Sequence, residues 1–163
     1  MNAEQLPARD PQDWMPEALW KQVKRHIPIP CVDIILQNPS GEILLGWRRI
    51  LPYRNVWALP GGRLFRGEDL QTAARRILSE YSISANHLYF VGVFPIRFPS
   101  RSDVSICVAS RHPSGEAEPD GMEFSRFHWT RKLPSRLGAN YRRMIQRWHL
   151  LTHNPQILEF NRL

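Results

Sequence analysis

The feature that most constrains this chain is a glycine-rich turn followed at once by an amphipathic helix. The turn lies within 57–68 and contains the adjacent pair Gly61 and Gly62. Because glycine has no Cβ, such a pair lets the backbone turn sharply and approach a ligand closely. Apolar residues then recur at helical spacing over 69–81, so one face of this helix is expected to pack inward. The segment therefore predicts a strand end, a turn suited to a ligand and a core helix.

Apolar runs on both sides of this helix predict strands, and two further amphipathic runs predict helices. The predicted strands lie at 31–37, 42–47, 56–59, 87–94, 104–110 and 124–129, and the helices at 16–24 and 141–151. Residues 95–103 are interpreted as a loop. The apolar stripe of the last helix is expected to pack into the core, with a dimer contact as the alternative. Together these elements indicate an α/β fold with a mixed sheet.

The length of 163 residues and the hydrophobic content of 42% are typical of one globular domain. We expect 1–15 to form a polar N-terminal arm and 16–163 to form the domain. The sequence shows neither an apolar run of membrane-spanning length nor the apolar segment of a signal peptide. Cys31 and Cys107 lie in apolar runs without metal-ligand spacing, which predicts buried free thiols. A cytoplasmic protein without a membrane partner is therefore expected.

The net charge of +7 favours an anionic partner, which could be nucleic acid or a small phosphorylated molecule. The arginines are scattered along the chain and are not interleaved with aromatic residues as they are in RNA-binding surfaces. A small-molecule ligand is thus the preferred interpretation, and nucleic acid is the weaker one. A solvated basic surface without a specific partner is a further alternative.

Three residues of the central segment resemble the Nudix box, the loop-helix signature of the Nudix hydrolases. Gly62, Glu68 and Arg76 match the first half of that box, with five and then seven residues between them. The second half is degenerate, because the places of the family's three glutamates and its glycine hold Ile77, Glu80, Tyr81 and Ile83. The resemblance implies the Nudix fold, an α/β/α sandwich, over about 16–153. It also implies structural roles for Gly62, Glu68 and Arg76, with Arg76 orienting box carboxylates.

The chain resembles one branch of this family, the GDP-mannose mannosyl hydrolases, beyond the box. That branch also lacks the first helix glutamate, and it cleaves at the sugar carbon rather than at phosphorus. Asp33 lies in an apolar strand before an Asn-x-x-Gly turn, as the aspartate that binds the sugar nucleotide does in that branch. Arg48 and Arg63 match two arginines that hold the diphosphate and support the leaving group. Because the branch is dimeric, the resemblance further implies a homodimer.

The chemistry of these side chains suits the implied roles but leaves alternatives. A carboxylate in an apolar strand costs free energy unless it is paired or lies in a site. Asp33 is therefore a candidate substrate ligand, or else an acid on the polar side of a strand. Guanidinium groups bind diphosphate oxygens in a bidentate manner, which makes Arg48 and Arg63 candidate substrate ligands and Arg63 a candidate catalytic residue. The alternative for both arginines is a solvated position at the surface.

Three positions are candidates for a magnesium site, with manganese as the alternative ion. Glu80 is the remaining acid of the degenerate half of the box, and Glu123 lies where the family commonly has a metal-binding or basic residue. Glu123 is therefore also a candidate catalytic base, or else a solvated acid in a turn. A backbone carbonyl near Ala58 would complete the site. Phe124 occupies the place of the branch's catalytic histidine, and the nearby His128 is more often structural than catalytic in a strand.

The sequence thus predicts a magnesium-dependent hydrolase of a nucleoside diphosphate sugar resembling GDP-mannose or GDP-glucose. Attack of water at the anomeric carbon would release the sugar and a nucleoside diphosphate. Attack at phosphorus would instead release a sugar phosphate and a nucleoside monophosphate. A second hypothesis is a Nudix-fold protein that binds nucleotide sugars without catalysis, which Ile77, Tyr81 and Phe124 favour. A role with nucleic acid, which the charge alone suggests, is the third.

Overall fold

The structure is a computed structural model that describes residues 15–154, 156 and 162–163. The predicted arm at 1–15 lies outside the described residues, apart from Met15. The elements are, in chain order, α1 (Glu17–His26), β1 (Ile29–Leu36), β2 (Ile43–Arg48), β3 (Trp57–Ala58), β4 (Gly61–Arg63), α2 (Leu70–Ser79), β5 (Tyr89–Phe98), β6 (Arg101–Ser110), β7 (Phe124–Thr130) and α3 (Ala139–Thr152).

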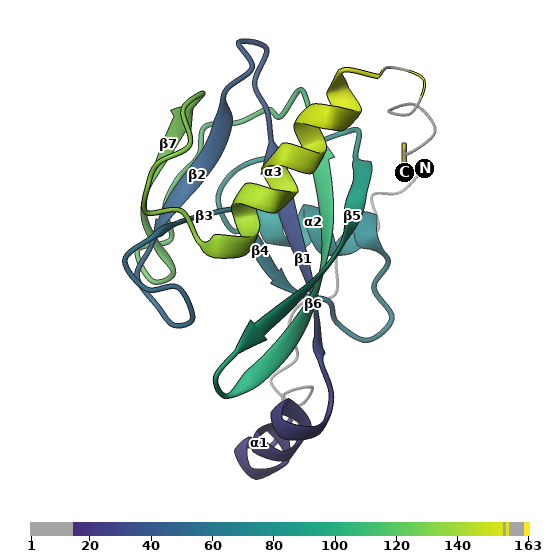
Figure 1. Cartoon of the computed structure of the whole chain (residues 1–163), viewed down its shortest axis with the longest axis vertical. Helices are drawn as coiled ribbons and strands as arrows, with labels where there is room; N and C mark the ends of the chain where they lie inside the picture. Colours follow the sequence, from purple (N-terminus) through teal and green to yellow (C-terminus); the bar gives the residue numbers. More distant parts are fainter. Residues whose placement is uncertain (1–14, 155, 157–161) are drawn as a thin grey trace.

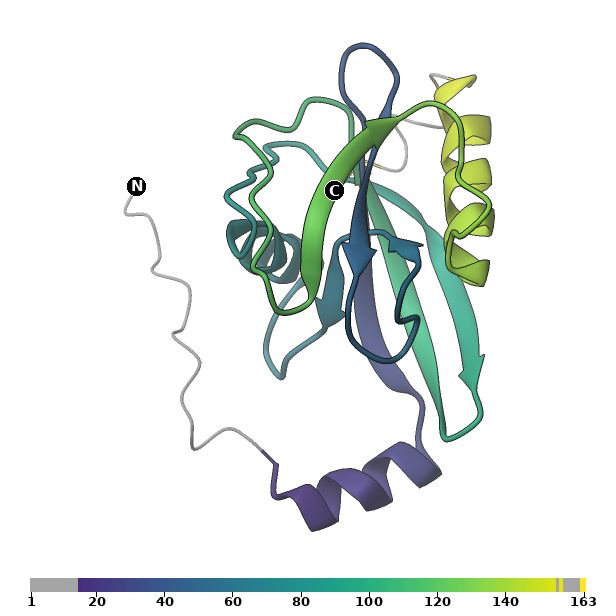
Figure 2. The same cartoon turned by 90° about the vertical axis from the view of Figure 1, so that its left-hand side faces the viewer.

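Two sheets form the middle of the molecule (Figure 1). The first is a mixed four-stranded sheet with the order β4-β1-β6-β5, in which β1 runs parallel to β6 and the other pairs are antiparallel. The second is an antiparallel sheet with the order β3-β2-β7. Figure 2 shows α2 and α3 on opposite sides of the strands. This arrangement confirms the predicted α/β/α sandwich with a mixed sheet, while α1 stands apart from it at the start of β1.

The core lies between the strands and the two covering helices. β1 is buried without interruption from Val32 to Leu36, as a central strand covered on both faces should be. α2 buries a face of small and aliphatic residues, which are Ala73, Ala74, Ile77 and Leu78. The apolar stripe of α3 is also buried within this chain, at Tyr141, Met144, Ile145, Trp148 and Leu151. That stripe is therefore core rather than a dimer contact.

The paired glycines differ from the prediction of a simple turn. Gly61 and Gly62 belong to β4 and pair with Asp33 and Val32 of β1. A Cβ at Gly61 would lie 2.3 Å from Oδ1 of Asp33, so glycine is required for this strand pairing. A Cβ at Gly62 would lie 3.2 Å from Cγ1 of Ile77, which keeps β4 and α2 in close contact. Glycine here serves close packing rather than a sharp turn.

The predicted loop at 95–103 is wrong, because this segment is the end of a β-hairpin. β5 continues to Phe98 and β6 begins at Arg101, so two residues connect the strands. Pro95 of β5 pairs with Val104 of β6, and β5 is an edge strand of its sheet. A proline is tolerated at an edge, since its missing N–H has no ladder partner to satisfy. The pairing with β6 therefore overrides the local signal for a loop.

Both cysteines are free thiols, with Cys107 buried and Cys31 half-buried. Burial raises the pKa of the Cys31 thiol to about 12, so this group stays protonated at neutral pH. In the part of the chain that the structure describes, no helix has the length and apolar character needed to cross a membrane.

Candidate active site

A cleft of about 520 Å³ brings together most of the residues that the sequence singled out. Its lining includes Asp33, Arg48, Arg63, Glu80 and Glu123. These side chains come from β1, β2, β4, the end of α2 and the turn before β7. The cleft also contains Gly62, Arg76 and Ile77 in its wall. Ala58 is fully buried and is not part of the lining, so the structure places its carbonyl outside the cleft surface.

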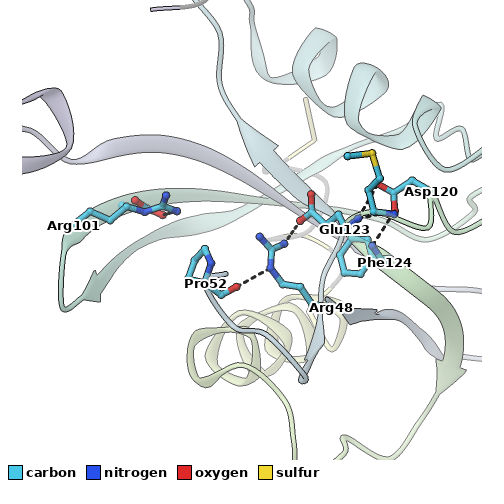
Figure 3. Close-up of polar contacts among 8 residues, drawn as sticks. Arg48, Pro52, Arg101, Asp120, Glu123 and Phe124 are labelled. Carbon is cyan, nitrogen blue, oxygen red and sulfur yellow. Dashed lines mark hydrogen bonds and ion pairs between the residues drawn. The ribbon is translucent and has the colours of Figure 1, made fainter. Parts of the chain in front are cut away.

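Arg48 and Glu123 form an ion pair at this cleft (Figure 3), through Nη1 of Arg48 and Oε1 of Glu123. Nε of Arg48 also donates a hydrogen bond to the carbonyl oxygen of Pro52 at 2.8 Å. Both charged side chains are partly covered, with exposed fractions of 14% for Arg48 and 23% for Glu123. The pairing joins a candidate substrate ligand to a candidate base, 75 positions apart in the sequence.

Asp120 fixes the segment that carries Glu123. Its carboxylate accepts hydrogen bonds from the backbone N–H groups of Glu123 at 3.0 Å and Phe124 at 2.9 Å (Figure 3). This side chain replaces the missing backbone partners at the start of β7, as aspartate commonly does in turns. The direction of Glu123 toward the cleft is therefore set by local hydrogen bonds.

Asp33 is buried in the wall of the cleft, with 7% of the residue exposed. The hydroxyl of Ser105 on β6 donates a hydrogen bond to its Oδ2. Burial raises the pKa of the Asp33 carboxyl to about 6, although the Ser105 hydrogen bond and the charge of Arg48 act in the opposite direction. Asp33 is thus not an acid on a solvated strand face. It is a buried carboxyl with a neighbouring hydroxyl at the ligand cleft.

Glu68 and Arg76 form a bidentate pair between the loop and α2. Nε and Nη2 of Arg76 donate to the two carboxylate oxygens of Glu68 at 2.6 Å and 2.8 Å. The same Nη2 donates to the backbone carbonyl of Arg63 at 2.9 Å, and the guanidinium lies 4.0 Å from the centre of the Phe65 ring. These contacts tie β4 to α2. They occupy Glu68 with a structural pairing and hold the backbone that carries Arg63.

Two positions that depart from the family pattern point into the core. Tyr81 and Phe124 are fully buried, and their ring centroids lie 5.4 Å apart. Phe127 packs on both rings, with centroid distances of 5.2 Å to each. Neither Tyr81 nor Phe124 is part of the cleft lining. The places that hold an acid and a histidine in the mannosyl hydrolases therefore hold an aromatic cluster here, and His128 is exposed on β7 away from the cleft.

The donor groups fit a magnesium ion only in part. Among the residues that the structure describes, no three His, Cys, Asp or Glu side chains gather closely enough to hold a metal. Glu80 and Glu123 nevertheless face the same cleft, and Glu80 is only 38% exposed beside Arg76, at 3.9 Å. Mg²⁺ commonly binds through one or two protein carboxylates together with the phosphates of a substrate. The two glutamates suit an ion of this kind only together with the phosphates of a substrate.

Sequence reasoning missed the far end of the cleft, which the β5–β6 hairpin forms. Tyr53 and Phe98 lie there with ring centroids 5.2 Å apart, and both line the cleft. Nη2 of Arg101 binds Oδ2 of Asp103 at 2.8 Å. Nε of Arg101 and Oδ1 of Asp103 are buried without a hydrogen-bond partner. No motif marks these residues, because their proximity depends on a hairpin that the prolines concealed.

Trp20 of α1 also reaches this site. Its ring centroid lies 4.1 Å from the guanidinium carbon of Arg63, which is within the range of a cation–π interaction. Lys24 lies over the same ring at 5.3 Å. The helix that stands outside the sandwich is therefore linked to a candidate catalytic residue through one aromatic side chain.

This fold agrees with the family comparison, in which the NUDIX domain matches residues 28–147. The chain belongs to the NUDIX domain family, within the Nudix hydrolase superfamily. A Bacillus subtilis relative, named provisionally as an 8-oxo-dGTP diphosphatase, is 33% identical over 115 residues, which are 69% of this chain and 74% of that protein.

Two further relatives match over shorter segments. The low-salt glycan biosynthesis protein Agl8 of Haloferax volcanii is 33% identical over 73 residues, which are 45% of this chain and 46% of that protein. An RNA pyrophosphohydrolase of Caulobacter vibrioides is 43% identical over 53 residues, which are 31% of this chain and 30% of that protein. The matched region therefore spans less than half of either relative.

Solved structures share the fold at lower sequence identity. A MutT NUDIX hydrolase from Burkholderia pseudomallei superposes with a TM-score of 0.70 at 21% identity, covering 75% of this chain and 98% of that one. The NUDIX domain of Shewanella oneidensis NrtR, solved with ADP ribose, gives a TM-score of 0.66 at 18% identity, covering 83% and 98%. At these identities the likeness establishes the fold alone.

Proposed function

We propose that this protein hydrolyses a derivative of a nucleoside diphosphate, and that the substrate is a nucleotide sugar resembling GDP-mannose or GDP-glucose. The observation that carries the proposal is the cleft itself. One space is lined by two arginines and two carboxylates, which are Arg48, Arg63, Glu80 and Glu123. It lies beside β4, the strand that contains the paired glycines. The guanidinium groups can form bidentate hydrogen bonds with the diphosphate, and the carboxylates can accept a proton or bind a metal ion.

The proposed reaction begins with an exchange of partners at Arg48. In the free protein this guanidinium neutralises Glu123. A bound diphosphate would compete for the same guanidinium, because its oxygens carry more charge and accept bidentate hydrogen bonds. Glu123 would then be released to accept a proton from the attacking water. Arg63, held through its backbone by Arg76, would stabilise the charge that develops on the leaving diphosphate.

Magnesium, or manganese in its place, belongs to this proposal as a partner of the substrate. Glu80 would hold the ion together with diphosphate oxygens, and Glu123 would be a second ligand as the alternative to its role as base. The bound ion would supply neutralisation of the diphosphate charge. Asp33 would bind the sugar nucleotide from the wall of the same cleft. A homodimer remains part of the proposal, which light scattering of the purified protein would test.

A second candidate function is binding of the nucleotide sugar without hydrolysis. The specific observation in its favour is the aromatic cluster at Tyr81 and Phe124, which replaces an acid and a histidine of the mannosyl hydrolases. This candidate retains the arginines and Asp33 as ligands but assigns no proton transfer to Glu123. The NrtR domain from Shewanella, which shares the fold, was solved with ADP ribose, a compound that also contains a nucleoside 5′-diphosphate.

The deciding experiment is a hydrolysis assay with Mg²⁺ or Mn²⁺ against GDP-mannose, GDP-glucose and related nucleotide sugars, with separation of all products. Free sugar that carries the oxygen of ¹⁸O-labelled water, together with GDP, indicates attack at carbon. Sugar phosphate with GMP indicates attack at phosphorus. Glu123→Gln and Arg63→Ala should each reduce turnover at least about 100-fold, in line with typical losses of a general base or an oxyanion ligand. Arg147→Ala, an exposed substitution on α3, serves as the control.

The outcomes separate the two candidates. Turnover that both site variants reduce, and the control does not, supports the hydrolase. Tight binding without turnover in either metal supports the binding protein. Turnover that is unaffected by Arg63→Ala and Glu123→Gln would contradict the assignment of this cleft.

A further inference from the structure

A second cleft, of about 420 Å³, lies between the C-terminal end of α1 and the tip of the β5–β6 hairpin. Both views place α1 beside this tip (Figures 1 and 2). Its ionisable lining residues are all basic, namely Lys24, Arg25, His26, Arg97 and Arg101. None of the described residues that line it is an aspartate or a glutamate. We call this space the basic cleft.

The basic residues reach the basic cleft from two separate elements. Lys24, Arg25 and His26 form the last turn of α1, where cations interact favourably with the helix dipole. That effect does not account for Arg97 and Arg101, which approach from the hairpin. Arg101 is already paired with Asp103 at 2.8 Å. The other like charges that face this space repel one another unless an anion lies between them. The arrangement therefore favours an anionic ligand.

The basic cleft adjoins the candidate active site. Phe98 and Arg101 line both spaces and form the wall between them. Phe98 also contacts Tyr53, whose ring lines the active-site cleft. Aromatic side chains of this kind pack against the base or ribose of a nucleotide. A nucleoside held against Tyr53 and Phe98 would thus lie next to the basic cleft.

We propose that the basic cleft binds a phosphate group on the ribose of the nucleotide whose 5′-diphosphate occupies the candidate active site. The chemical class is a ribose 3′-phosphate, which can be a monoester in a free nucleotide or the first diester of an RNA 5′ end. Arg97 and Lys24 are the principal ligands, because guanidinium and ammonium groups form charge-assisted hydrogen bonds with phosphate oxygens. The inference rests on the proposed function, since it requires a nucleotide in the neighbouring cleft.

The test compares two ligands that differ by one phosphate. Isothermal titration in the presence of Mg²⁺, with ligand integrity checked by chromatography, would measure the affinity for GDP and for guanosine 5′-diphosphate 3′-phosphate. The wild-type protein should bind the second ligand at least about tenfold more tightly, which corresponds to about 1.4 kcal/mol. The double variant Lys24→Ala/Arg97→Ala should lose this gain and keep its affinity for GDP. Arg143→Ala/Arg147→Ala, which also removes two positive charges but from exposed positions of α3, should behave as the wild type.

A 5′-diphosphorylated dinucleotide forms the third arm and distinguishes the two sources of the phosphate. Binding as tight as that of the 3′-monoester supports a diester and hence an RNA end. Weaker binding, at the level of GDP, assigns the site to a free 3′-phosphorylated nucleotide.

The result that would overturn the inference is equal affinity for GDP and its 3′-phosphorylated form. A gain that survives in the double variant would overturn it as well. If GDP binds but the 3′-phosphate adds no affinity, the inference about the basic cleft is wrong while the proposed function stands. If neither ligand binds and no nucleotide sugar is hydrolysed, both the inference and the proposed function fail.

Discussion

Asp33 shows at the scale of one residue how folding changes chemistry. In the sequence it is an acid within an apolar strand, and in the structure it lies buried beside Ser105 and Gly61. Burial disfavours its charged form more than the Ser105 hydrogen bond and Arg48 favour it, so the pKa rises from 3.8 to about 6. A buried carboxylate of this kind lowers stability while it places a polar group at the ligand cleft.

This shift predicts a pH-dependent stability. Because the folded-state pKa of Asp33 lies above its unfolded value, the folded protein binds the proton more tightly between the two pKa values. The contribution of Asp33 to the free energy of unfolding should therefore fall as the pH rises from about 4 to about 6, and then stay low. Relative to the wild type, Asp33→Asn should gain about 1–3 kcal/mol between pH 4 and pH 7.

Urea denaturation of both proteins at pH 4, 5, 6 and 7 would measure this difference. The Asp33→Asn variant keeps a hydrogen-bonding side chain of similar size, so the comparison isolates the charge. A difference in unfolding free energy that is independent of pH would contradict the raised pKa.

At the scale of the element, α1 lies outside the core, whereas the segment that ends α2 leads into it. α1 buries none of its residues and contacts the site through Trp20, whereas α2 ends in a buried aromatic cluster at Tyr81. The first element can therefore influence ligand binding with little effect on stability. The second cannot be altered without loss of core packing.

Trp20→Ala should weaken ligand binding more than it weakens the fold. Removal of the ring leaves the Arg63 guanidinium without its 4.1 Å aromatic contact, and cation–π pairs contribute about 0.5–1 kcal/mol at exposed sites. We expect the Kd for GDP to rise about two- to fivefold, with little change in Tm. Leu19→Ala, an exposed substitution on the same helix, is the matched control. A large fall in Tm with unchanged affinity would assign Trp20 a purely structural role.

Replacement of Tyr81 by the acid of the family pattern should destabilise the protein and should not increase its activity. Tyr81→Glu would remove an aromatic ring from contact with Phe124 and Phe127 and place a charge in an apolar environment. The expected loss of unfolding free energy is about 4 kcal/mol. Gln146→Glu, at an exposed position in the middle of α3, should change it by less than about 0.5 kcal/mol. A stable, more active Tyr81→Glu enzyme in chemical denaturation and hydrolysis assays would refute this interpretation of the aromatic cluster.

At the scale of the whole molecule, the net positive charge and the positions of the two clefts both favour the binding of an anionic ligand. The chain carries a net charge of +7, and its two described clefts share the wall formed by Phe98 and Arg101. Long-range attraction of an anionic ligand and short-range binding by arginine forks therefore favour the same region. This combination makes phosphate the chemistry to which the molecule is best suited.

Affinity for GDP should consequently fall as ionic strength rises. Salt screens charges beyond a Debye length of about 10 Å at 0.1 M, so part of the attraction is lost between 50 mM and 500 mM NaCl. Guanosine is the matched neutral ligand, and its affinity should change little over this range. Equal salt dependence of the two ligands in titration calorimetry would mean that charge does not guide binding.

The prediction of the site from the sequence was limited by distance along the chain. Gly62, Glu68 and Arg76 could be recognised because their spacing is local and falls within one strand-loop-helix segment. The ion pair of Arg48 with Glu123 could not, since it joins residues 75 positions apart. The Phe98–Arg101 wall was concealed for another reason, because prolines in 95–103 indicated a loop until pairing with β6 was known.

The sequence by itself determined the α/β class, the helices and the apolar faces, because periodicity records which side of each element is buried. Only the tertiary structure decided what the polar residues do. It made Asp33 a buried carboxyl, paired Arg48 with Glu123, and turned Tyr81 and Phe124 into core. Side-chain function depends on contacts between distant segments, and those contacts form only when the sheets and helices pack together.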